Sequence, residues 1–369
     1  MARLDEICTI NMGQSPESSS YNETGDGLPF FQGNADFGSL HPTVRIWCNS
    51  PTKTASPGDI LISVRAPIGA LNIADVDCCI GRGLAALTVN ERFCKKEYLW
   101  YAIAGKVKEL NEKGTGSTFK AIGKSVLAET EIPLPPVNKQ HYIANVLDLL
   151  NRLIFLRQQQ LAKLDELVKA RFVEMFVGKA KSKNLEPLSN YLEYITYGFT
   201  NPMPDTEVGP WKITAKDVVD GQINFSTARK TSVEAFSKLS AKSKPTIGSV
   251  LLTKDGTLGR TAIVENENIC VNQSVAVLKC NQRVIPRFLM QLLQMPEYQQ
   301  VMLANSGGGT IKHIYITKVD KMLIAVPDIA LQKRFIDFVE QTDKSRLTIQ
   351  QSLAKLEVLK KTLMQEYFG

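Results

Sequence analysis

The stretch 138–177 most limits what this chain can fold into, because it contains neither glycine nor proline and exceeds the length of an ordinary surface helix. It follows Leu134-Pro135-Pro136 and stops at Gly178, signals typical of the two ends of a helix. Positions spaced alternately by four and three residues are apolar in eight of ten cases. They are Ile143, Leu147, Leu150, Ile154, Arg157, Leu161, Leu164, Val168, Arg171 and Met175. This heptad seam predicts a helix, roughly 60 Å long, that packs along a partner helix.

The expected partner is the stretch 328–368, which follows Val326-Pro327 and precedes Gly369. The same spacing gives apolar or aromatic residues at seven of ten positions. They are Phe335, Val339, Thr342, Arg346, Ile349, Leu353, Leu356, Lys360, Leu363 and Tyr367. We expect an antiparallel coiled coil with a weak centre at Thr342 and Arg346. The alternative is two helices that each pack on their own domain.

The two halves of the chain repeat one another. Gly58-Asp59-Ile60-Leu61 matches Gly248-Ser249-Val250-Leu251, Gly81-Arg82-Gly83 matches the region of Asn272-Gln273-Ser274, and Gly116-Ser117-Thr118 matches Gly308-Gly309-Thr310. The offset stays between 190 (58 to 248) and 192 (116 to 308). We also match Arg65 with Lys254, allowing one extra residue in the second turn.

Short β-like runs punctuated by glycine and proline precede each long helix, among them Leu28–Gln32, Val44–Trp47, Asp59–Val64, Gly69–Ile73 and Leu84–Val89, and a helix is expected over Glu97–Asn111. The predicted fold class is α+β. Two similar mixed α/β domains, 1–137 and 179–327, are separated by the long helices 138–178 and 328–369. Antiparallel pairing would relate the domains by a pseudo-twofold axis and hold them at opposite ends of a strut, as a ruler for two half-sites on duplex DNA.

Bulk properties narrow the function classes only slightly. The formal charge is 44 − 37 = +7 and the pI is about 8.9, which is compatible with a polyanion partner. The seven cysteines are odd in number and form no C-x-x-C, so we expect reduced thiols in a cytoplasmic protein. The N-terminal residues form no secretory signal, and no run of eighteen apolar residues predicts a membrane span.

Motifs for catalysis are missing, so we expect no catalytic and no metal-binding residues. Gly123-Lys124-Ser125 lacks the earlier glycine of a phosphate-binding loop, because Thr118 occupies that position. No acidic residue is followed two positions later by lysine, as metal-dependent nucleases often require. Asn201-Pro202-Met203-Pro204 lacks the aromatic residue with which an amino-methyltransferase stacks on a flipped base.

Binding residues are the better prediction, because glycine-rich loops allow close approach to phosphate, arginine reads guanine and amides read adenine. Each residue alone could equally be a solvated surface side chain, but polar or basic residues recur at matched places in both halves. The candidate DNA-binding residues are Gln14, Ser15, Tyr21, Asn22, Lys53, Arg65, Arg82, Gly116, Ser117, Lys120, Tyr197, Thr200, Lys216, Lys254, Arg260, Asn272, Gln273, Gly308, Lys312 and His313.

Several stretches recur in an order that is typical of one family. They are Gly13-Gln14-Ser15-Pro16, Leu28-Pro29-Phe30-Phe31-Gln32-Gly33, Gly58-Asp59-Ile60-Leu61, Arg65-Ala66-Pro67-Ile68-Gly69 and Ile132-Pro133-Leu134-Pro135-Pro136 with Gln140, echoed by Ala325-Val326-Pro327 with Gln332. With the duplication and the two long helices, the whole chain resembles the specificity subunit of a type I restriction-modification enzyme.

The resemblance implies two target recognition domains that read a bipartite site in double-stranded DNA, with the helices as spacer and as docking surface for methyltransferase subunits. Restriction subunits would join that core. The family implies no catalysis and no cofactor in this chain, so S-adenosylmethionine, ATP and Mg are expected only on partner subunits. The sequence differences between the two domains predict two different half-sites. The alternatives are a coiled-coil adaptor that binds no DNA and a stand-alone DNA-modifying enzyme with an unrecognised active site.

Overall fold

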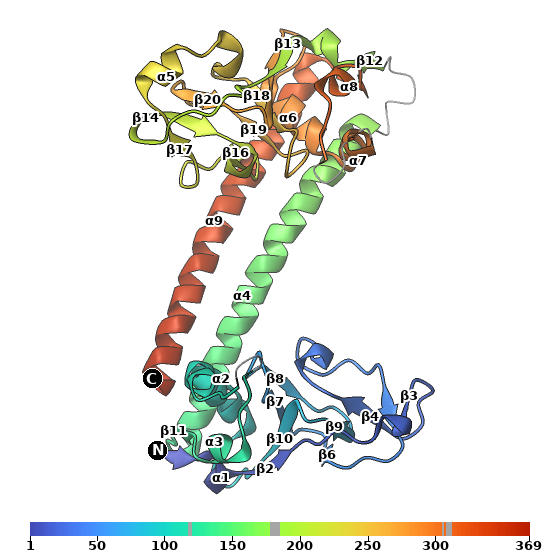
Figure 1. Ribbon diagram of the computed structural model, residues 1–369, viewed down its shortest axis with the longest axis vertical. Coiled ribbons are helices and arrows are strands. Elements are labelled where there is room, and N and C mark those ends of the chain that lie inside the picture. The colour runs from blue at the N-terminus through green and yellow to red at the C-terminus, as the bar shows by residue number, and fades with distance from the viewer. Residues whose placement is uncertain (117–119, 178–184, 305, 308–311) are drawn as a thin grey trace. The chain divides into compact units, whose positions relative to one another are not determined.

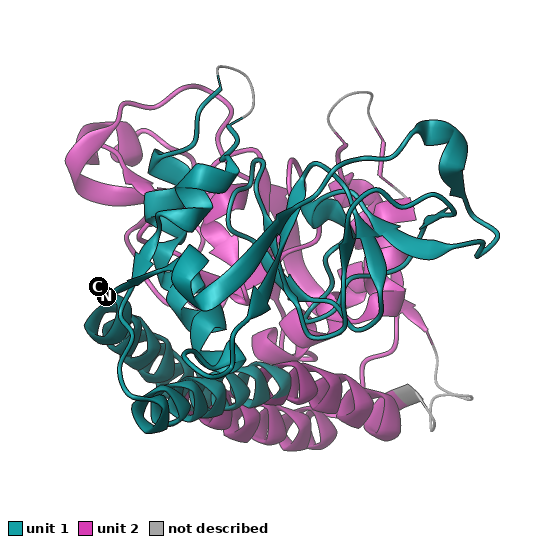
Figure 2. Cartoon of the chain, turned by 90° about the horizontal axis from the view of Figure 1, so that it is seen from below, with its two compact units in different colours: residues 1–159, 349–369 teal, residues 160–348 magenta. Residues whose placement is uncertain are grey.

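The computed structural model describes residues 1–116, 120–177, 185–304, 306–307 and 312–369. The chain divides into two compact units: unit 1 comprises 1–159 and 349–369, and unit 2 comprises 160–348 (Figure 2). Each unit contains a globular part and a section of both long helices. Within the described residues, no helix has both the length and the apolar character needed to cross a membrane.

Unit 1 is built on two sheets. A four-stranded sheet has the order β2-β10-β7-β8, and a five-stranded sheet has the order β3-β5-β4-β9-β6 (Figure 1). Its elements before the long helix are β1 Ala2–Arg3, α1 Leu4–Ile7, β2 Cys8–Met12, β3 Tyr21–Asn22, β4 Leu28–Phe31, β5 Trp47–Cys48, β6 Thr54–Ala55, β7 Ile60–Ser63, β8 Leu71–Ile73, β9 Cys78–Ile80, β10 Leu84–Val89, α2 Lys96–Glu112, α3 Lys124–Ala128 and β11 Glu131–Ile132.

Unit 2 repeats the four-stranded sheet in the order β13-β21-β18-β19, beside a three-stranded sheet β17-β14-β20. Its elements outside the long helices are β12 Glu186–Pro187, β13 Leu192–Tyr197, β14 Thr206–Ile213, β15 Val218–Val219, β16 Gln222–Ile223, β17 Arg229–Lys230, α5 Val233–Ser237, β18 Val250–Thr253, β19 Thr261–Ile263, β20 Ile269–Val271, β21 Val275–Cys280, α6 Pro286–Gln294, α7 Pro296–Ala304, α8 Ile316–Asp320 and β22 Leu323–Ile324.

The central strands are buried on both faces, which explains why they are continuous apolar runs rather than alternating ones. In β7, Ile60 and Ile62 pack in the core beneath α2, whereas Leu61 packs against residues of the second sheet. In β18, Val250 and Leu252 face the helical core and Leu251 faces the second sheet. The predicted run Val44–Trp47 was wrong in its bounds, since β5 covers only Trp47–Cys48, and short β9 was not predicted.

Pairing registers confirm the duplication. Leu84 pairs with Ser63 on β10 and β7, and Val275 pairs with Thr253 on β21 and β18, so equivalent residues occupy equivalent places in the two ladders. The offsets are 253 − 63 = 190 and 275 − 84 = 191, within the range read from the sequence.

The long helices are α4 Val137–Phe172, extended by a π-helical turn Val173–Val177, and α9 Ile329–Phe368. All twenty predicted seam positions are buried or half-buried. In unit 1 the first section of α4 and the last section of α9 share one core, in which Leu147 and Phe368 are buried. In unit 2 the end of α4 meets the beginning of α9, with Phe172 and Phe335 rings 5.6 Å apart. This reversed order is that of an antiparallel pair, and the weak centre is bridged in unit 2 by Arg346 and Asp165 at 2.7 Å.

The end of each long helix docks through matched aromatic residues on the helix that follows the last strand of a four-stranded sheet, α2 in unit 1 and α6 in unit 2. The Phe368 ring of α9 lies 5.4 Å from Tyr98 of α2, and the Phe176 ring, which follows α4, lies 5.3 Å from Phe288 of α6. Tilted and T-shaped aromatic pairs of this kind stabilise more than their buried area alone accounts for. The duplication therefore includes the junctions between helices and globular parts.

A buried glutamine fixes the start of each long helix. The Gln140 amide donates to the carbonyls of Phe93 (2.9 Å) and Pro135 (2.8 Å), and its Oε1 accepts from the Lys95 N–H at 2.8 Å. Gln332 makes the same three bonds: it donates to the carbonyls of Arg283 (3.0 Å) and Pro327 (2.8 Å), and it accepts from the Ile285 N–H at 2.8 Å. Both glutamines are fully buried. Each satisfies backbone groups that would otherwise be unpaired at a helix start.

Candidate nucleic-acid interface

In each unit, loops gather at one edge of the four-stranded sheet. In unit 1, β2 and β7 end at this edge and β10 begins there, because β10 is antiparallel to both. The loop 13–15, the turn 64–69 and the turn 81–83 are therefore neighbours. Backbone bonds join them: the Gly13 N–H donates to the Leu84 carbonyl at 2.9 Å and the Val64 N–H to the Gly83 carbonyl at 2.9 Å.

Unit 2 builds the same edge with equivalent bonds. The Lys254 N–H donates to the Ser274 carbonyl at 2.9 Å, as Val64 does to Gly83. The Phe199 N–H donates to the Val271 carbonyl at 3.0 Å, as the Gln14 N–H does to the Ile80 carbonyl at 3.0 Å. Glycine is required where β2 and β13 end, because a Cβ would lie 2.2 Å from the Gly81 oxygen at Gly13 and 1.7 Å from the Val271 oxygen at Gly198. This close approach brings the residues after the glycine beside the next turn. In unit 1, Gln14 and Ser15 lie beside the turn that begins at Gly81. In unit 2, Phe199 and Thr200 lie beside the turn that begins at Asn272.

The glycine-rich loops lie at this edge too. The Thr115 and Ala121 backbones form a bridge, as do Gly307 and His313, and Ile122 and Ile314 donate to the carbonyls of Val64 (2.9 Å) and Lys254 (2.8 Å). Gly116, with φ +123°, is exposed, and so are the side chains of Lys120 and Lys312. The candidates Ser117 and Gly308 lie outside the described residues.

The predicted match of Arg65 with Lys254 was wrong. The Gly69 N–H donates to the Ser63 carbonyl at 2.9 Å and the Gly259 N–H to the Thr253 carbonyl at 2.9 Å, so the two turns have equal length and no residue is inserted. Arg65 is therefore equivalent to Asp255, and Lys254 to buried Val64. The similar charge of Arg65 and Lys254 had suggested their match, but the backbone hydrogen bonds that close each turn determine which residues are equivalent.

The reversed charge changes what this turn offers. Asp255 accepts from Lys254 at 2.9 Å and lies 2.6 Å from the Nδ1 atom of His313. The ammonium of Lys254 also lies 5.4 Å from the ring centroid of exposed Tyr197. Lys254 and His313 are therefore tied to one carboxylate, whereas Arg65 is exposed and has no hydrogen-bond or ion-pair partner among the residues with described positions.

A hollow of about 340 Å³ lies at this edge of unit 1. Its lining includes Arg45, Arg65 and Arg82, together with Gln32 and Asn34. Among the described residues, Arg45 is the one of these three arginines with an ion pair, to the carboxylate of Asp36. The hollow therefore combines two unpaired guanidinium groups with neutral amides, a set that suits the acceptor-rich edge of a base or a phosphate.

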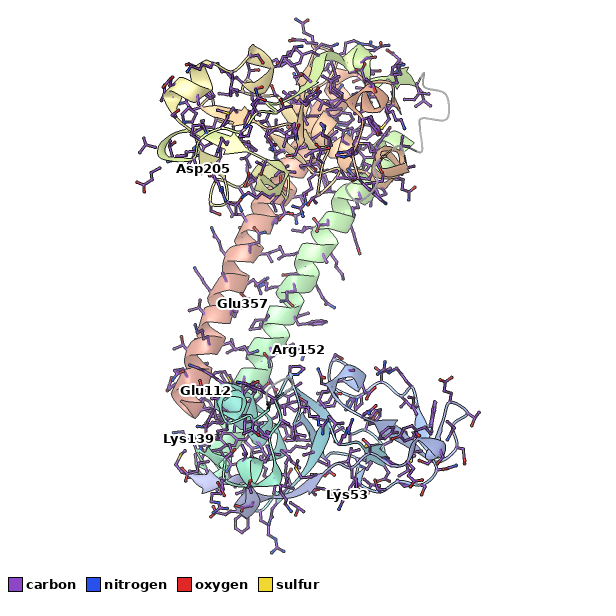
Figure 3. The ribbon with its side chains drawn as sticks, in the orientation of Figure 1. Lys53, Glu112, Lys139, Arg152, Asp205 and Glu357 are labelled. Atoms are coloured by element: carbon purple, nitrogen blue, oxygen red, sulfur yellow. The ribbon has the colours of Figure 1, made fainter. Side chains whose placement is uncertain are left out.

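Unit 2 has a hollow of about 360 Å³ at the equivalent place, lined by Lys212, Thr214, Lys216, Arg229 and Asn272 among others. The ammonium of Lys212 donates to the carbonyls of Met203 (3.1 Å) and Pro204 (3.2 Å) and pairs with Asp205. Arg229 also reaches Asp205, at 2.7 Å. These two cations lower the pKa of Asp205, which is labelled in Figure 3. In this hollow, Lys216 remains exposed.

A matched aspartate, which sequence reasoning missed, shapes both hollows. Oδ2 of Asp36 accepts from the Gly33 N–H at 3.3 Å, and Oδ2 of Asp217 accepts from the Thr214 N–H at 2.9 Å, each capping a 3-10 helix. Oδ1 of Asp36 holds Arg45, whereas Oδ1 of Asp217 accepts from the Thr227 hydroxyl at 2.9 Å. The available signal was an aspartate three residues after a capping position in both halves.

Three further candidates, Tyr21, Lys53 and Arg260, have partly or fully exposed side chains. Tyr21 stacks on Phe30 with centroids 4.7 Å apart; burial raises its pKa, and the nearby charge of Arg82 partly opposes that effect. Lys53, labelled in Figure 3, is exposed and follows Thr52, whose hydroxyl donates to the Gln14 carbonyl at 2.7 Å. Arg260 is exposed directly before β19, and its guanidinium donates to the Val218 carbonyl at 3.5 Å.

Asn22 has a local role, because its Oδ1 accepts from Thr24 and Asp26 and its amide donates to the Asp26 carbonyl at 2.8 Å. These bonds close its own turn. Among the residues that the structure places, no three His, Cys, Asp or Glu side chains come together as metal ligands would. Burial raises the pKa of the Cys8, Cys78 and Cys94 thiols to about 12, so these thiols stay protonated and unreactive.

Comparison with known proteins identifies the family. The model of the type I restriction modification DNA specificity domain matches residues 1–166 and 172–359. This chain belongs to that family. The predicted resemblance to the type I specificity subunits is confirmed.

Relatives in the family have the same printed role. The MjaX specificity subunit of Methanocaldococcus jannaschii is 40% identical over 47% of this chain, and the chain spans only 41% of that relative's length. The EcoBI specificity subunit of Escherichia coli is 22% identical over 99% of this chain and 84% of its own length. A crystal structure of a type I restriction-modification system S subunit from M. genitalium, 16% identical, has a TM-score of 0.59 over 100% of this chain and 95% of that chain. The family fold therefore extends over both units.

Proposed function

We propose that this chain is the sequence-specific DNA-binding subunit of a type I restriction-modification complex, and that each unit reads one half of a bipartite site in double-stranded DNA. One observation carries this proposal: the two hollows are built by the same backbone bonds but lined by different polar side chains. A shared scaffold with changed recognition residues is what two different half-sites require. The unread spacer would be a property of the helices that link the units.

The proposed DNA contacts are of two kinds, to phosphates and to base edges. Exposed lysines on the loops, Lys53, Lys120, Lys216 and Lys312, suit phosphates, which position a protein without specifying a sequence. Ser15, Arg65 and Arg82 in unit 1, and Thr200, Asn272 and Gln273 in unit 2, lie where base edges would enter. A major-groove edge presents donors and acceptors that arginine and amide side chains distinguish.

The long helices offer the docking surface for methyltransferase subunits. On α4 within unit 1, Tyr142, Leu149 and Phe155 are each more than half exposed, and on α9 Val358 is 66% exposed. Exposed apolar side chains along a helix suit a partner subunit. We assign adenine methylation and DNA cleavage in the cytoplasm to such methyltransferase and restriction subunits, which would carry S-adenosylmethionine, ATP and Mg.

Methylation mapping tests the proposal. The full chain would be expressed with the methyltransferase subunits that copurify with it, in a host that lacks adenine methylation. We expect methylated adenines only within a two-part motif whose parts are separated by unread bases, and none when this chain is left out. Methylation that persists without the chain, or that falls in random or contiguous sequence, would contradict the proposal.

A further inference from the structure

Arg82 and Gln273 occupy the same place in the two units. The Arg82 N–H donates to the Ser15 hydroxyl at 3.2 Å, and the Gln273 N–H donates to the Phe199 carbonyl at 2.8 Å. The residue after each one accepts a backbone hydrogen bond from the turn that follows β7 or β18. The Gly83 carbonyl accepts from the Val64 N–H and the Ser274 carbonyl from the Lys254 N–H, both at 2.9 Å. The two side chains therefore leave equivalent backbones that are anchored on both sides.

Both side chains are available to a ligand. Each is exposed, and neither makes a hydrogen bond or ion pair with any residue in the described ranges. Arg82 lines the hollow of unit 1, and Gln273 directly follows Asn272, which lines the hollow of unit 2. Neither would have to break an internal bond to meet a base.

Other matched positions are less suited to this task. Asn272 is equivalent to Gly81, which has no side chain, and its Oδ1 already accepts from the Ser274 N–H (3.1 Å) and hydroxyl (2.6 Å). An amide oxygen with both lone pairs used cannot also accept from adenine N6. At the position of Arg65, both oxygens of Asp255 are taken by Lys254 and His313. Of the matched pairs at these two turns, 65/255, 81/272 and 82/273, only the pair Arg82 and Gln273 has two side chains without a hydrogen bond or ion pair among the described residues.

From this geometry we infer that Arg82 and Gln273 are equivalent base-reading residues, so that the half-site of unit 1 contains a guanine where the half-site of unit 2 contains an adenine. The chemistry follows from the two groups: a guanidinium donates twice to guanine O6 and N7, whereas an amide accepts from adenine N6 and donates to N7. The inference rests on the proposed function and adds the base that each unit reads.

Selection from a randomised duplex pool tests this inference. The full chain, with the methyltransferase subunits that copurify with it, would select duplexes as wild type, Arg82→Gln, Gln273→Arg and Arg82→Lys. Arg92→Gln is the matched control, because Arg92 is exposed and lies outside the hollow. We expect Arg82→Gln to replace one guanine by adenine in one half of the motif, with a change of about 10- to 100-fold in relative affinity at that position. Gln273→Arg should make the opposite change in the other half.

The outcomes separate the inference from the proposed function. A bipartite motif that Arg82→Gln and Gln273→Arg leave unchanged overturns the inference and leaves the proposed function standing. No motif with the wild-type chain overturns both. If misfolding of the Arg82→Gln variant abolishes selection of both half-sites, the Arg82→Lys variant decides the question. It keeps the charge, so it should weaken only the preference for guanine. An unchanged preference for guanine contradicts the inference.

Discussion

The hollows of unit 1 and unit 2 share a scaffold but hold their cations differently. In unit 1, the guanidinium groups of Arg65 and Arg82 make no hydrogen bond or ion pair with a described residue, whereas that of Arg45 is paired with Asp36. In unit 2, Lys212 and Arg229 share Asp205. Backbone bonds and a capping aspartate preserve the shape, while the side chains around them vary freely. Scaffold and recognition are therefore separable in this fold, and substitutions should affect one or the other.

The largest effect should come from the scaffold that both units share. Gln140→Ala or Gln332→Ala removes three hydrogen bonds and leaves buried backbone groups unpaired, so each should lower the free energy of unfolding by about 3 kcal/mol. Denaturant unfolding of each variant measures this loss. The exposed Gln158→Ala should change it by less than about 0.5 kcal/mol. If only one of the two variants lost stability, the two glutamines would not contribute equally to the free energy of unfolding, and this prediction would be wrong.

The capping aspartates should differ. Asp217 is fully buried and accepts three bonds from Thr214 and Thr227, so Asp217→Asn should cost about 2 kcal/mol. Asp36→Asn should cost about 1 kcal/mol, because its side chain keeps some exposure and its partner Arg45 is itself largely exposed. Thermal unfolding compares them, with exposed Asp75→Asn as control. Equal losses would contradict the difference in burial.

The cations should differ in DNA binding. Arg65→Ala and Arg82→Ala should each weaken binding to the selected duplex about tenfold, because each removes an unpaired donor group. Lys212→Ala should change affinity less, because its ammonium is already bonded to Met203, Pro204 and Asp205. Titration at several salt concentrations checks this, and a residue that contacts phosphate should lower the salt slope by about 0.9. An equal loss of DNA affinity in all three variants would contradict the predicted difference between unpaired and internally bonded cations.

The smallest effect concerns a surface ion pair found only in unit 2. Glu186 pairs with Arg283 at 2.8 Å, and this bond lowers the pKa of Glu186 to about 2. Because the folded pKa lies below the unfolded value of about 4.3, the pair stabilises fully above that value and is lost as pH falls towards 2. Glu186→Gln should therefore lower Tm slightly at pH 7 and not at pH 2.

The control for this prediction is Glu207→Gln, an exposed carboxylate without an ion pair in the part of the chain that is described. Its Tm difference should be the same at both pH values. Unit 1 has Ala2 and Phe93 at the places of Glu186 and Arg283, so it offers no equivalent pair. A Glu186→Gln difference that persisted at pH 2 would contradict the assignment.

Features with a strong periodic cause could be predicted from the sequence. The heptad seam located both long helices, and matched glycines such as Gly58 and Gly248, each with positive φ, marked equivalent turns. The turn after β7 was misaligned because similar charge placed Arg65 on Lys254, whereas hydrogen bonds across the turn decide its register. Sequence similarity in a short polar loop carries less information than the backbone bonds that close it.

The candidate site could be predicted only in part. Arg82 and Gln273 were found because polar or basic residues recur at matched turns in the two halves, after β9 and β20 respectively. Asp36 and Asp217 were missed because they act through a short 3-10 helix whose flanking residues differ between the halves. Asn22 was proposed as a contact, but its amide closes a local turn. Such local side-chain bonds leave no periodic trace in the sequence.

Competition with scrambled duplexes tests the central claim, two separate readers in one chain, most directly. Duplexes from the selected motif would be scrambled in the first half, in the spacer or in the second half, and bound by wild type and by Arg65→Ala/Arg82→Ala. We expect wild type to lose affinity when either half is scrambled and not when the spacer is scrambled. The double variant should become insensitive to one half only. Equal sensitivity to the spacer, or loss of preference in both halves, would contradict the account.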